Sequence, residues 1–217
     1  EAAKDGREYG LAVAEMVTKL CDGHGVVNAK ALDEYLGPAV PGVRLRLVEG
    51  VPAVTQVVDP AAAKAGLAVG DVVVAVGGEK AAERMARYGK YLSGSTPAGH
   101  ARAVLSRVLG GPDGSECTLT VRGADGKDRD VAVKRAVEFR TFRPQLGDAH
   151  KVLDGNVGYV DLARLRVQDV GPMFAALKDT KGIVFDMRGY PNGTAWALDP
   201  RLNVKGARGE AECRRPL

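Results

Sequence analysis

One histidine of this sequence lies where the chain can present its imidazole to a reacting partner. His24 lies between Gly23 and Gly25 in the run Cys-Asp-Gly-His-Gly, which predicts a turn at the end of a helix. Glycine neighbours have no side chains to pack the ring, so such a turn can present it. On the residues alone, an exposed histidine without a chemical role stays open as the alternative.

The residues that could bind a metal or form disulfides are dispersed along the chain. The cysteines have no CxxC spacing and the histidines form no cluster, so we expect free thiols, no metal site and no cofactor. These residues are Cys21, Cys117 and Cys213, and His24, His100 and His150.

Length and composition describe an ordinary globular protein. The chain has 217 residues, of which 45% are hydrophobic and 27% charged, enough for one or two domains with a packed core. Lys and Arg number 31 against 27 Asp and Glu, and this net charge of +4 is too small and dispersed to predict a nucleic-acid partner. Apolar runs such as Val72–Val76 are far shorter than the roughly 20 residues of a membrane helix, so no stable membrane insertion is expected. The oligomeric state stays open.

We expect an α+β protein in three parts, the first of which is a helical lead-in over residues 1–40. Apolar residues at helical spacing predict an amphipathic helix over 10–20, and a second short helix is predicted over 29–35. The residues of the apolar stripe are Val13, Met16, Val17 and Leu20.

Residues 41–138 predict a small, mostly β domain with two helices. Alternating or β-branched stretches predict strands at 43–48, 52–58, 71–76, 117–122 and 130–134. One helix is predicted over 81–92, and another begins at Thr96-Pro97, a capping residue followed by proline, and ends at Gly110. Its apolar residues Ala101, Val104, Leu105 and Val108 keep helical spacing, which predicts that one face packs on the sheet.

Residues 139–217 begin with a polar linker over 140–147 and then predict a βαβ unit. A strand at 157–162, a helix at 168–178 and a strand at 182–188 are typical of parallel strands joined by a crossover helix. The loop 189–193 would lie at the carboxyl end of a parallel strand, where open α/β sheets place ligands. One βαβ unit cannot close a core, and the chain starts at Glu1 without Met, so we expect a mature or excised piece of a longer protein.

The segment 61–78, AAAKAGLAVGDVVVAVGG, resembles the "PA..AGL..GD.I..I.G" core of bacterial PDZ domains. The resemblance implies that an extended peptide tail is added as a strand and that backbone amides of a loop over 41–44 hold its carboxylate. The residues then implied to bind the peptide are Gly42, Val43, Arg44, Leu45, His100 and Val104. Arg44 and Arg46 either form a solvated strand face or attract a peptide carboxylate.

The rest of the chain resembles the S41 peptidases, the C-terminal processing (tail-specific) and tricorn-like proteases. The runs VGYVDL at 157–162 and TKGIVFDMRGYPNG at 180–193 are similar to the family's "GYI.L … KG.I.DLRGNPGG". The resemblance implies a crotonase-like α/β catalytic domain, His24 as general base, and the backbone N–H groups of Asn192 and Gly193 as oxyanion-hole donors. Tyr190 and Asn192 stand where the family usually has Asn and Gly, and no serine follows Gly193.

Two hypotheses follow. The first is a serine endopeptidase of the S41 type whose PDZ domain binds free C-terminal tails of polypeptide substrates; this chain would be an inactive N-terminal part, because the nucleophile would lie downstream. The second is a non-catalytic PDZ peptide-binding or scaffolding protein. The S41 resemblance implies a compartment outside the cytoplasm, the periplasm or cell envelope.

Overall fold

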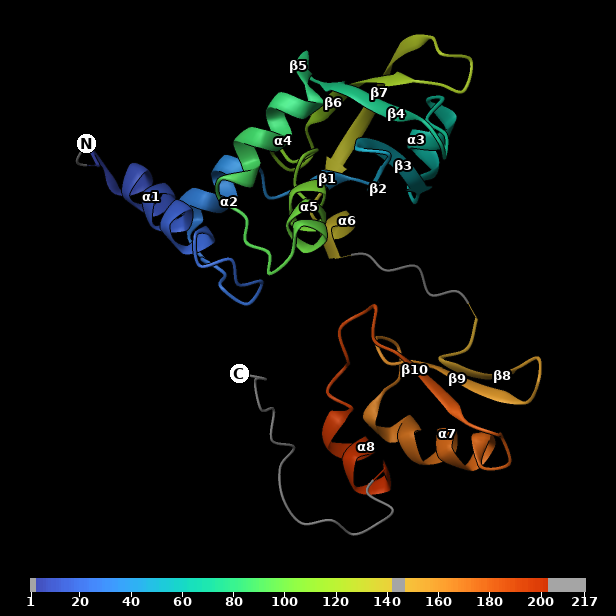
Figure 1. The fold of residues 1–217 in the computed structure, drawn as a ribbon. Helices are drawn as coiled ribbons and strands as arrows, with labels where there is room; N and C mark the ends of the chain where they lie inside the picture. The colour runs from blue at the N-terminus through green and yellow to red at the C-terminus, as the bar shows by residue number, and fades with distance from the viewer. Residues whose placement is uncertain (1–2, 142–146, 203–217) are drawn as a thin grey trace. The chain divides into compact units, whose positions relative to one another are not determined.

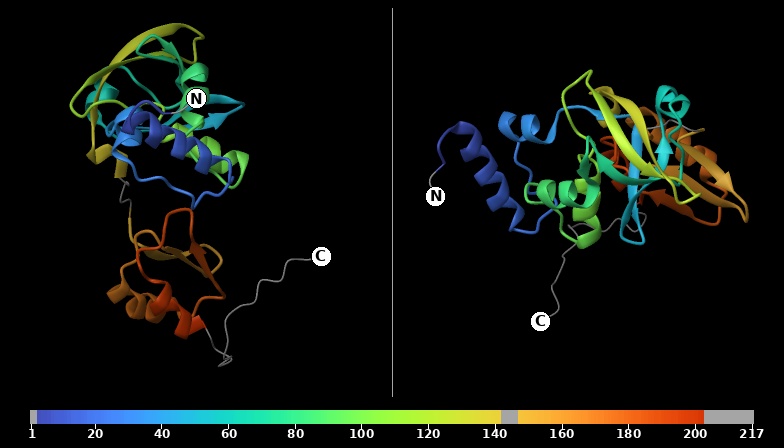
Figure 2. Two further views of the ribbon diagram at one scale, coloured as in Figure 1. Left: turned by 90° about the vertical axis from the view of Figure 1, so that its left-hand side faces the viewer. Right: turned by 90° about the horizontal axis from the view of Figure 1, so that it is seen from above.

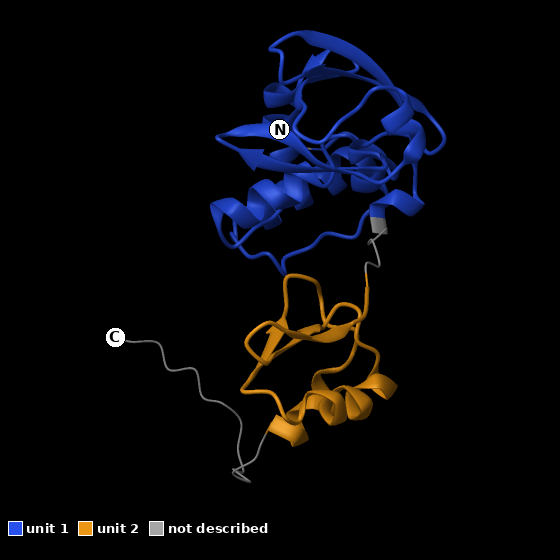
Figure 3. Cartoon of the chain, turned by 90° about the vertical axis from the view of Figure 1, so that its right-hand side faces the viewer, with its two compact units in different colours: residues 1–143 blue, residues 144–217 orange. Residues whose placement is uncertain are grey.

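A computed structural model describes residues 3–141 and 147–202 of the chain. The chain divides into two compact units, residues 1–143 and 144–217, which Figure 3 colours separately. Each unit has its own sheet and its own hydrophobic core. The middle of the predicted polar linker, residues 142–146, lies outside the described residues.

The first unit opens with the two expected helices, α1 (Gly6–Thr18) and α2 (Lys30–Leu36). The sequence predicts α1 from residue 10, but the helix begins at Gly6 because Asp5 caps it. The Oδ1 atom of Asp5 accepts a hydrogen bond of 2.8 Å from the backbone N–H of Glu8, which satisfies one of the free donors of the first turn.

The buried side of α1 differs from the predicted apolar stripe. Ala14 is buried, whereas Met16 and Leu20 of the stripe are exposed. The reason is a close approach of the two helices, since a Cβ atom on Gly10 would lie 3.3 Å from the Cβ atom of Ala31 in α2. The small residues of α1 therefore face α2, and the larger ones face solvent.

A seven-stranded antiparallel sheet forms the body of the first unit. Its strands follow the order β1-β7-β6-β4-β3-β2, with β5 paired to β4. All five predicted strands are present, and β1 and β5 are additional two-residue strands. The strands are β1 (Val40–Pro41), β2 (Val43–Val48), β3 (Val51–Val57), β4 (Val72–Val76), β5 (Glu79–Lys80), β6 (Glu116–Arg122) and β7 (Asp128–Ala136). The β2–β3 turn, Glu49-Gly50, has positive φ at both residues, as a tight type I′ hairpin requires.

Four helices accompany this sheet: α3 (Pro60–Lys64), α4 (Ala81–Gly89), α5 (Pro97–Leu105) and α6 (Glu138–Thr141). The predicted cap of α5 is confirmed, because Thr96 Oγ1 accepts the N–H of Gly99 at 3.0 Å. The helices α4 and α5 lie between the α1–α2 pair and the sheet (Figures 1 and 2).

The apolar residues of α5 and of the turns after it divide between two clusters. Leu105 and Val108 join the cluster that covers the sheet, so the prediction that this face packs on the sheet is confirmed for them. Val104 packs elsewhere, in a second cluster with Leu36 of α2 and Tyr88 of α4. The helix α5 therefore packs against the sheet on one side and against the lead-in helices on another.

The second unit contains the predicted βαβ arrangement. β9 and β10 pair in parallel, with Ile183 opposite Gly158, and α7 connects them. β8 pairs antiparallel with β9 and was not predicted; it begins at His150, between the predicted linker over 140–147 and the strand predicted at 157–162. The elements are β8 (His150–Leu153), β9 (Val157–Asp161), the 3-10 turn η1 (Val167–Asp169), α7 (Val170–Leu177), β10 (Ile183–Asp186) and α8 (Ala195–Leu202).

The mixed helix and strand content is as expected, but these elements do not show a crotonase-like catalytic domain. None of the helices within residues 3–141 and 147–202 combines the length and the apolar character that crossing a bilayer requires.

Candidate functional site

The first sheet has an open edge at β2. Among the described strands β2 pairs only with β3, and α5 lies beside it. The backbone N–H and C=O groups of an edge strand can pair with an added strand. We use the name β2–α5 groove for the exposed edge of β2, residues 43–48, together with the adjacent helix α5, residues 97–105.

The loop before β2 is tightly packed at Gly42. Its carbonyl oxygen accepts the N–H groups of Val58 at 2.7 Å and Asp59 at 3.0 Å. A Cβ atom here would lie 2.6 Å from the Cβ of Asp59, so only glycine fits. Val43 follows in the sheet core, and Leu45 packs against the same cluster. Gly42, Val43 and Leu45 thus lie together at one end of the β2–α5 groove.

Arg44 is tied to the helix that ends the first unit. Its Nη2 donates to the carbonyl oxygen of Phe139 in α6 at 2.8 Å, and its Nη1 donates to the carbonyl oxygen of Val43 at 3.3 Å. Burial lowers the pKa of the Arg44 guanidinium, which nevertheless stays charged. Arg44 therefore links the loop at the groove to α6.

The structure gives His100 and Val104 partners on the α4 side of α5. The Nε2 atom of His100 lies 3.0 Å from the carbonyl oxygen of Gly89, the last residue of α4. Val104 packs with Tyr88 of the same helix. Leu105 is the α5 residue that packs in one cluster with Val43 and Leu45.

His24 lies in the predicted turn and presents its ring to solvent. Its side chain is 96% exposed, with Nδ1 3.4 Å from Oδ1 of Asp22. The backbone N–H of His24 also donates to that carboxylate, which holds the pKa of Asp22 below its usual range. The turn is anchored by the N–H of Gly23, which donates to Oγ of Ser95 at 2.8 Å. The anchor residue directly precedes the N-cap of α5.

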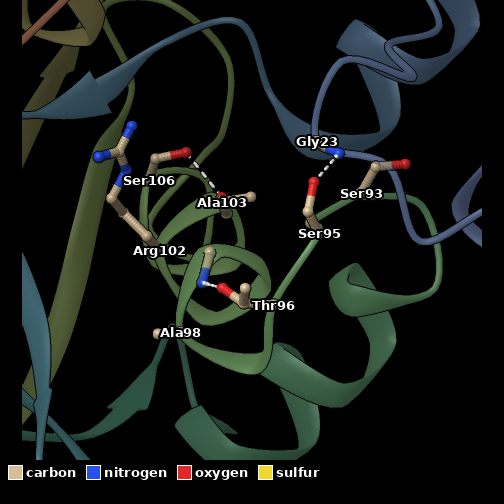
Figure 4. A pocket seen from close by; sticks show the side chains of 10 residues that line it. Gly23, Ser93, Ser95, Thr96, Ala98, Arg102, Ala103 and Ser106 are labelled. Carbon is tan, nitrogen blue, oxygen red and sulfur yellow. Dashed lines mark hydrogen bonds between the residues drawn. The ribbon is translucent and has the colours of Figure 1, made fainter. Parts of the chain in front are cut away.

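A hollow of about 610 Å³ lies between this turn and α5 (Figure 4). Gly23 and Ser95 are at one end, and Arg102 lies toward the other. Ser106 Oγ donates to the carbonyl oxygen of Ala103 at 2.7 Å and Ser95 Oγ accepts from Gly23, whereas Ser93 Oγ is buried and has no hydrogen-bond partner among the described residues. We assign the hollow no ligand.

The predicted oxyanion donors lie in the loop between β10 and α8, in the second unit. The N–H of Asn192 donates to the carbonyl oxygen of Leu162 at 3.2 Å, so this donor is engaged within the chain. Gly193 has a φ of 70°, a conformation that favours glycine. Thr194 follows, fully buried at the start of α8, and its Oγ1 has no hydrogen-bond partner among the described residues.

An ion pair between Asp186 and Arg188 braces the start of this loop. Nη2 of Arg188 lies 2.6 Å from Oδ2 of Asp186, which holds the pKa of that carboxyl well below its usual range. The Oη atom of Tyr159 donates to the same oxygen at 2.6 Å, and this bond raises the pKa of Tyr159. A carboxylate so engaged serves as a brace rather than as an acid or base.

In the described ranges, no group of three or more His, Cys, Asp or Glu side chains could hold a metal ion. Cys21 is an exposed free thiol and Cys117 a buried one, and burial raises the pKa of Cys117. Cys213 lies outside the described residues.

Sequence reasoning missed three residues around these sites. Ser95 holds the His24 turn, Phe139 packs against Gly42, with its ring 3.0 Å from where a Cβ would be, and Arg102 lines the hollow. Only Ser95 had a local signal, its place before a capped helix. No spacing in the sequence links any of the three to its partner.

Comparison with known proteins identifies a PDZ domain in the first unit. Residues 54–101 match the family model of the PDZ domain, a range that runs from β3 into α5. No curated protein matches the chain.

Several solved structures are similar. The peptide-bound PDZ domain of a carboxy-terminal protease from Vibrio cholerae is 24% identical, with a TM-score of 0.31 over 45% of this chain and 93% of that one. A Ser-to-Ala mutant of CPAF is 15% identical, with a TM-score of 0.54 over 86% of this chain and 47% of that one. Mature CPAF is 14% identical, with a TM-score of 0.49 over 83% of this chain and 45% of that one. The chain thus spans about half the length of CPAF, and the match to the mutant shows a common fold.

Proposed function

We propose that this chain is part of a serine endopeptidase of the S41, C-terminal processing type, in which the PDZ domain captures the C-terminal tails of polypeptide substrates. The PDZ match, the fold shared with CPAF and the S41-like runs at 157–162 and 180–193 support this proposal. The resemblance to S41 peptidases alone supports a periplasmic or cell-envelope location.

The observation that carries tail binding is the open edge of β2 beside α5. A tail added to this edge gains main-chain hydrogen bonds, and its side chains enter the groove in alternation. Val43, Leu45 and Leu105 lie in or against one apolar cluster at the loop end, which suits an apolar terminal residue.

Fluorescence anisotropy with a labelled peptide ending in Ala-Val tests the capture of tails. The peptide with a free carboxylate should bind at least about tenfold more tightly than its amidated form, because hydrogen bonds to a charged group are worth about 1.5–3 kcal/mol. Equal affinity for the two peptides would remove the carboxylate loop over residues 41–44 from the proposal.

For catalysis we propose His24 as the general base of a serine supplied by the longer protein. The serines of this chain, Ser93, Ser95, Ser106 and Ser115, all precede the second unit, so the 217 residues should bind tails without cutting them. A fluorophosphonate probe should leave the chain unlabelled, and labelling at any of the four serines would contradict this. In the longer protein, His24→Ala should lower kcat by several orders of magnitude.

One observation favours the second candidate, a non-catalytic PDZ scaffolding protein. The N–H of Asn192, a candidate oxyanion donor, is engaged with the carbonyl oxygen of Leu162. If the longer protein also lacks a serine nucleophile and keeps its biological activity in His24→Ala, this candidate replaces the protease.

A further inference from the structure

We propose that the β2–α5 groove selects C-terminal tails that carry acidic side chains a few residues before the terminal one. This inference rests on the proposed capture of tails and adds the charge of the ligand to it.

Both walls of the groove are basic. The strand β2 reads Val-Arg-Leu-Arg-Leu-Val and α5 reads Pro-Ala-Gly-His-Ala-Arg-Ala-Val-Leu. Together they contain three arginines and no aspartate or glutamate. The acidic residue next to the loop, Asp59, is committed to α3, because its Oδ1 accepts the N–H of Ala61 at 2.8 Å. Glu49 lies beyond the far end of β2, in the hairpin turn.

Two of these arginines lack a partner. Arg46 and Arg102 are exposed, and no side-chain hydrogen bond or ion pair joins either to another residue in the described part of the chain. Most other arginines of this unit pair with a carboxylate; these are Arg84, Arg87, Arg107, Arg122, Arg129 and Arg140. One of these cations therefore lies on β2 and the other on α5, where an anion of an added tail could meet them.

Strand alternation lets one tail reach both arginines. Leu45 packs toward the cluster that contains Leu105 of α5, so Arg46, the next residue, points to the other side of the strand. In a tail added to β2, one side chain likewise faces α5, with Arg102, and its neighbour lies beside Arg46 at about 5 Å between Cβ atoms. Arg46 is three residues beyond Val43, roughly 10 Å along the strand. The acidic pair is therefore expected at the third and fourth residues from the carboxyl end.

The test compares labelled peptides that end in a free carboxylate and differ at these two positions only. One carries Glu-Glu before Ala-Val, the second Gln-Gln and the third Lys-Lys. At low salt the Glu-Glu peptide should bind about fivefold more tightly than the Gln-Gln peptide, since an exposed ion pair contributes up to about 1 kcal/mol. The difference should shrink at high salt because mobile ions screen such pairs.

Variants test whether the two arginines cause the tighter binding of the Glu-Glu peptide. Arg46→Gln and Arg102→Gln should each weaken binding of the Glu-Glu peptide about two- to threefold and leave the Gln-Gln peptide unchanged. Lys64 is an exposed cation at the end of α3. Lys64→Gln should leave the affinity for both peptides unchanged and serves as the matched control. The double variant Arg46→Glu/Arg102→Glu should reverse the order, so that the Lys-Lys peptide binds more tightly than the Glu-Glu peptide.

The outcomes separate this inference from the proposed function. If the Glu-Glu and Gln-Gln peptides bind equally while amidation abolishes binding, tail capture stands and acidic selection is wrong. If amidation has no effect, or no peptide binds, both are wrong. The peptide series on the unaltered chain decides the matter even where a variant fails to fold.

Discussion

The guanidinium of Arg44 donates a hydrogen bond of 2.8 Å to the carbonyl oxygen of Phe139. The first residue lies at the loop expected to hold a peptide carboxylate, and the second lies in α6, the last helix of the first unit. The ring of Phe139 also packs on Gly42 of that loop. The loop and α6 therefore form one contact surface, and a change at one is expected to reach the other.

Arg44→Gln should loosen α6 and leave the sheet unchanged. The variant loses a charged donor to the carbonyl of Phe139, and a hydrogen bond contributes about 1 kcal/mol, so backbone amides of residues 138–141 should exchange with deuterium about fivefold faster. Hydrogen exchange read by mass spectrometry measures this. Arg46→Gln, on the same strand, is the control and should leave these amides unaffected. Equal exchange in both variants would contradict the link.

Gly42→Ala should destabilise the first unit by about 1–3 kcal/mol and abolish binding of a free C-terminal peptide. The added Cβ would lie 2.6 Å from the Cβ and 2.9 Å from the backbone nitrogen of Asp59, and backbone there cannot move aside cheaply. Urea unfolding and peptide titration measure the two effects. Gly6→Ala, where a Cβ meets nothing within 4 Å, should be neutral or slightly stabilising. Unchanged peptide binding in Gly42→Ala would contradict the position of the loop.

Glu79→Gln should lower the free energy of unfolding by about 1–2 kcal/mol at pH 7. Glu79 accepts hydrogen bonds from Arg87 at 2.7 and 2.9 Å and from Arg84 at 2.8 Å. These bonds lower its pKa from 4.5 to about 2. Because the folded pKa lies below the unfolded one, this stabilisation is complete above the unfolded pKa and is lost as the pH falls toward the folded one.

The pH dependence distinguishes this effect from loss of packing. The difference between the unaltered chain and Glu79→Gln should be constant above about pH 5.5 and shrink toward pH 2. Glu83→Gln removes an exposed pair with Lys80, 3.6 Å apart, and should change stability by less than about 0.5 kcal/mol. A difference independent of pH in Glu79→Gln would show that the ion pairs are not its cause.

His24→Ala should leave the stability of the chain within about 0.5 kcal/mol, since the ring is 96% exposed. Thermal unfolding followed by circular dichroism measures this. The expected neutrality matters because any loss of turnover in the longer protein can then be assigned to chemistry. A clear loss of stability would mean that the imidazole has a structural role.

The strands were predictable because β-branched runs and turn residues are local signals. The run 43–48 became β2 without change, and the capped start of α5 at Thr96-Pro97 was also correct. The segments that were missed carry conflicting signals. Pro200 lies inside α8, where proline is unfavourable, and the four residues of β8 are too short for alternation to be recognised.

The orientation of side chains was predicted less well than the elements. His100 and Val104 were expected at the peptide, but both have partners on α4. The reason is that α5 has apolar residues on two sides, and spacing alone cannot say which side meets β2. Spacing alone also failed to predict that Met16 and Leu20 are exposed. The small residues Gly10 and Ala14 let α2 approach α1 on a different side from the predicted stripe.

Because α5 packs on two sides, it also determines how far the chain can be shortened from its N-terminus. Leu32 and Leu36 of the lead-in help to bury Tyr88 and Val104, each 3% exposed. A polypeptide trimmed to begin at residue 41 would uncover both side chains, at about 1.5–3 kcal/mol for each if fully bared. Residues 3–141 should therefore melt in a single cooperative transition, and a transplant of this peptide-binding module into another protein needs to include its first two helices.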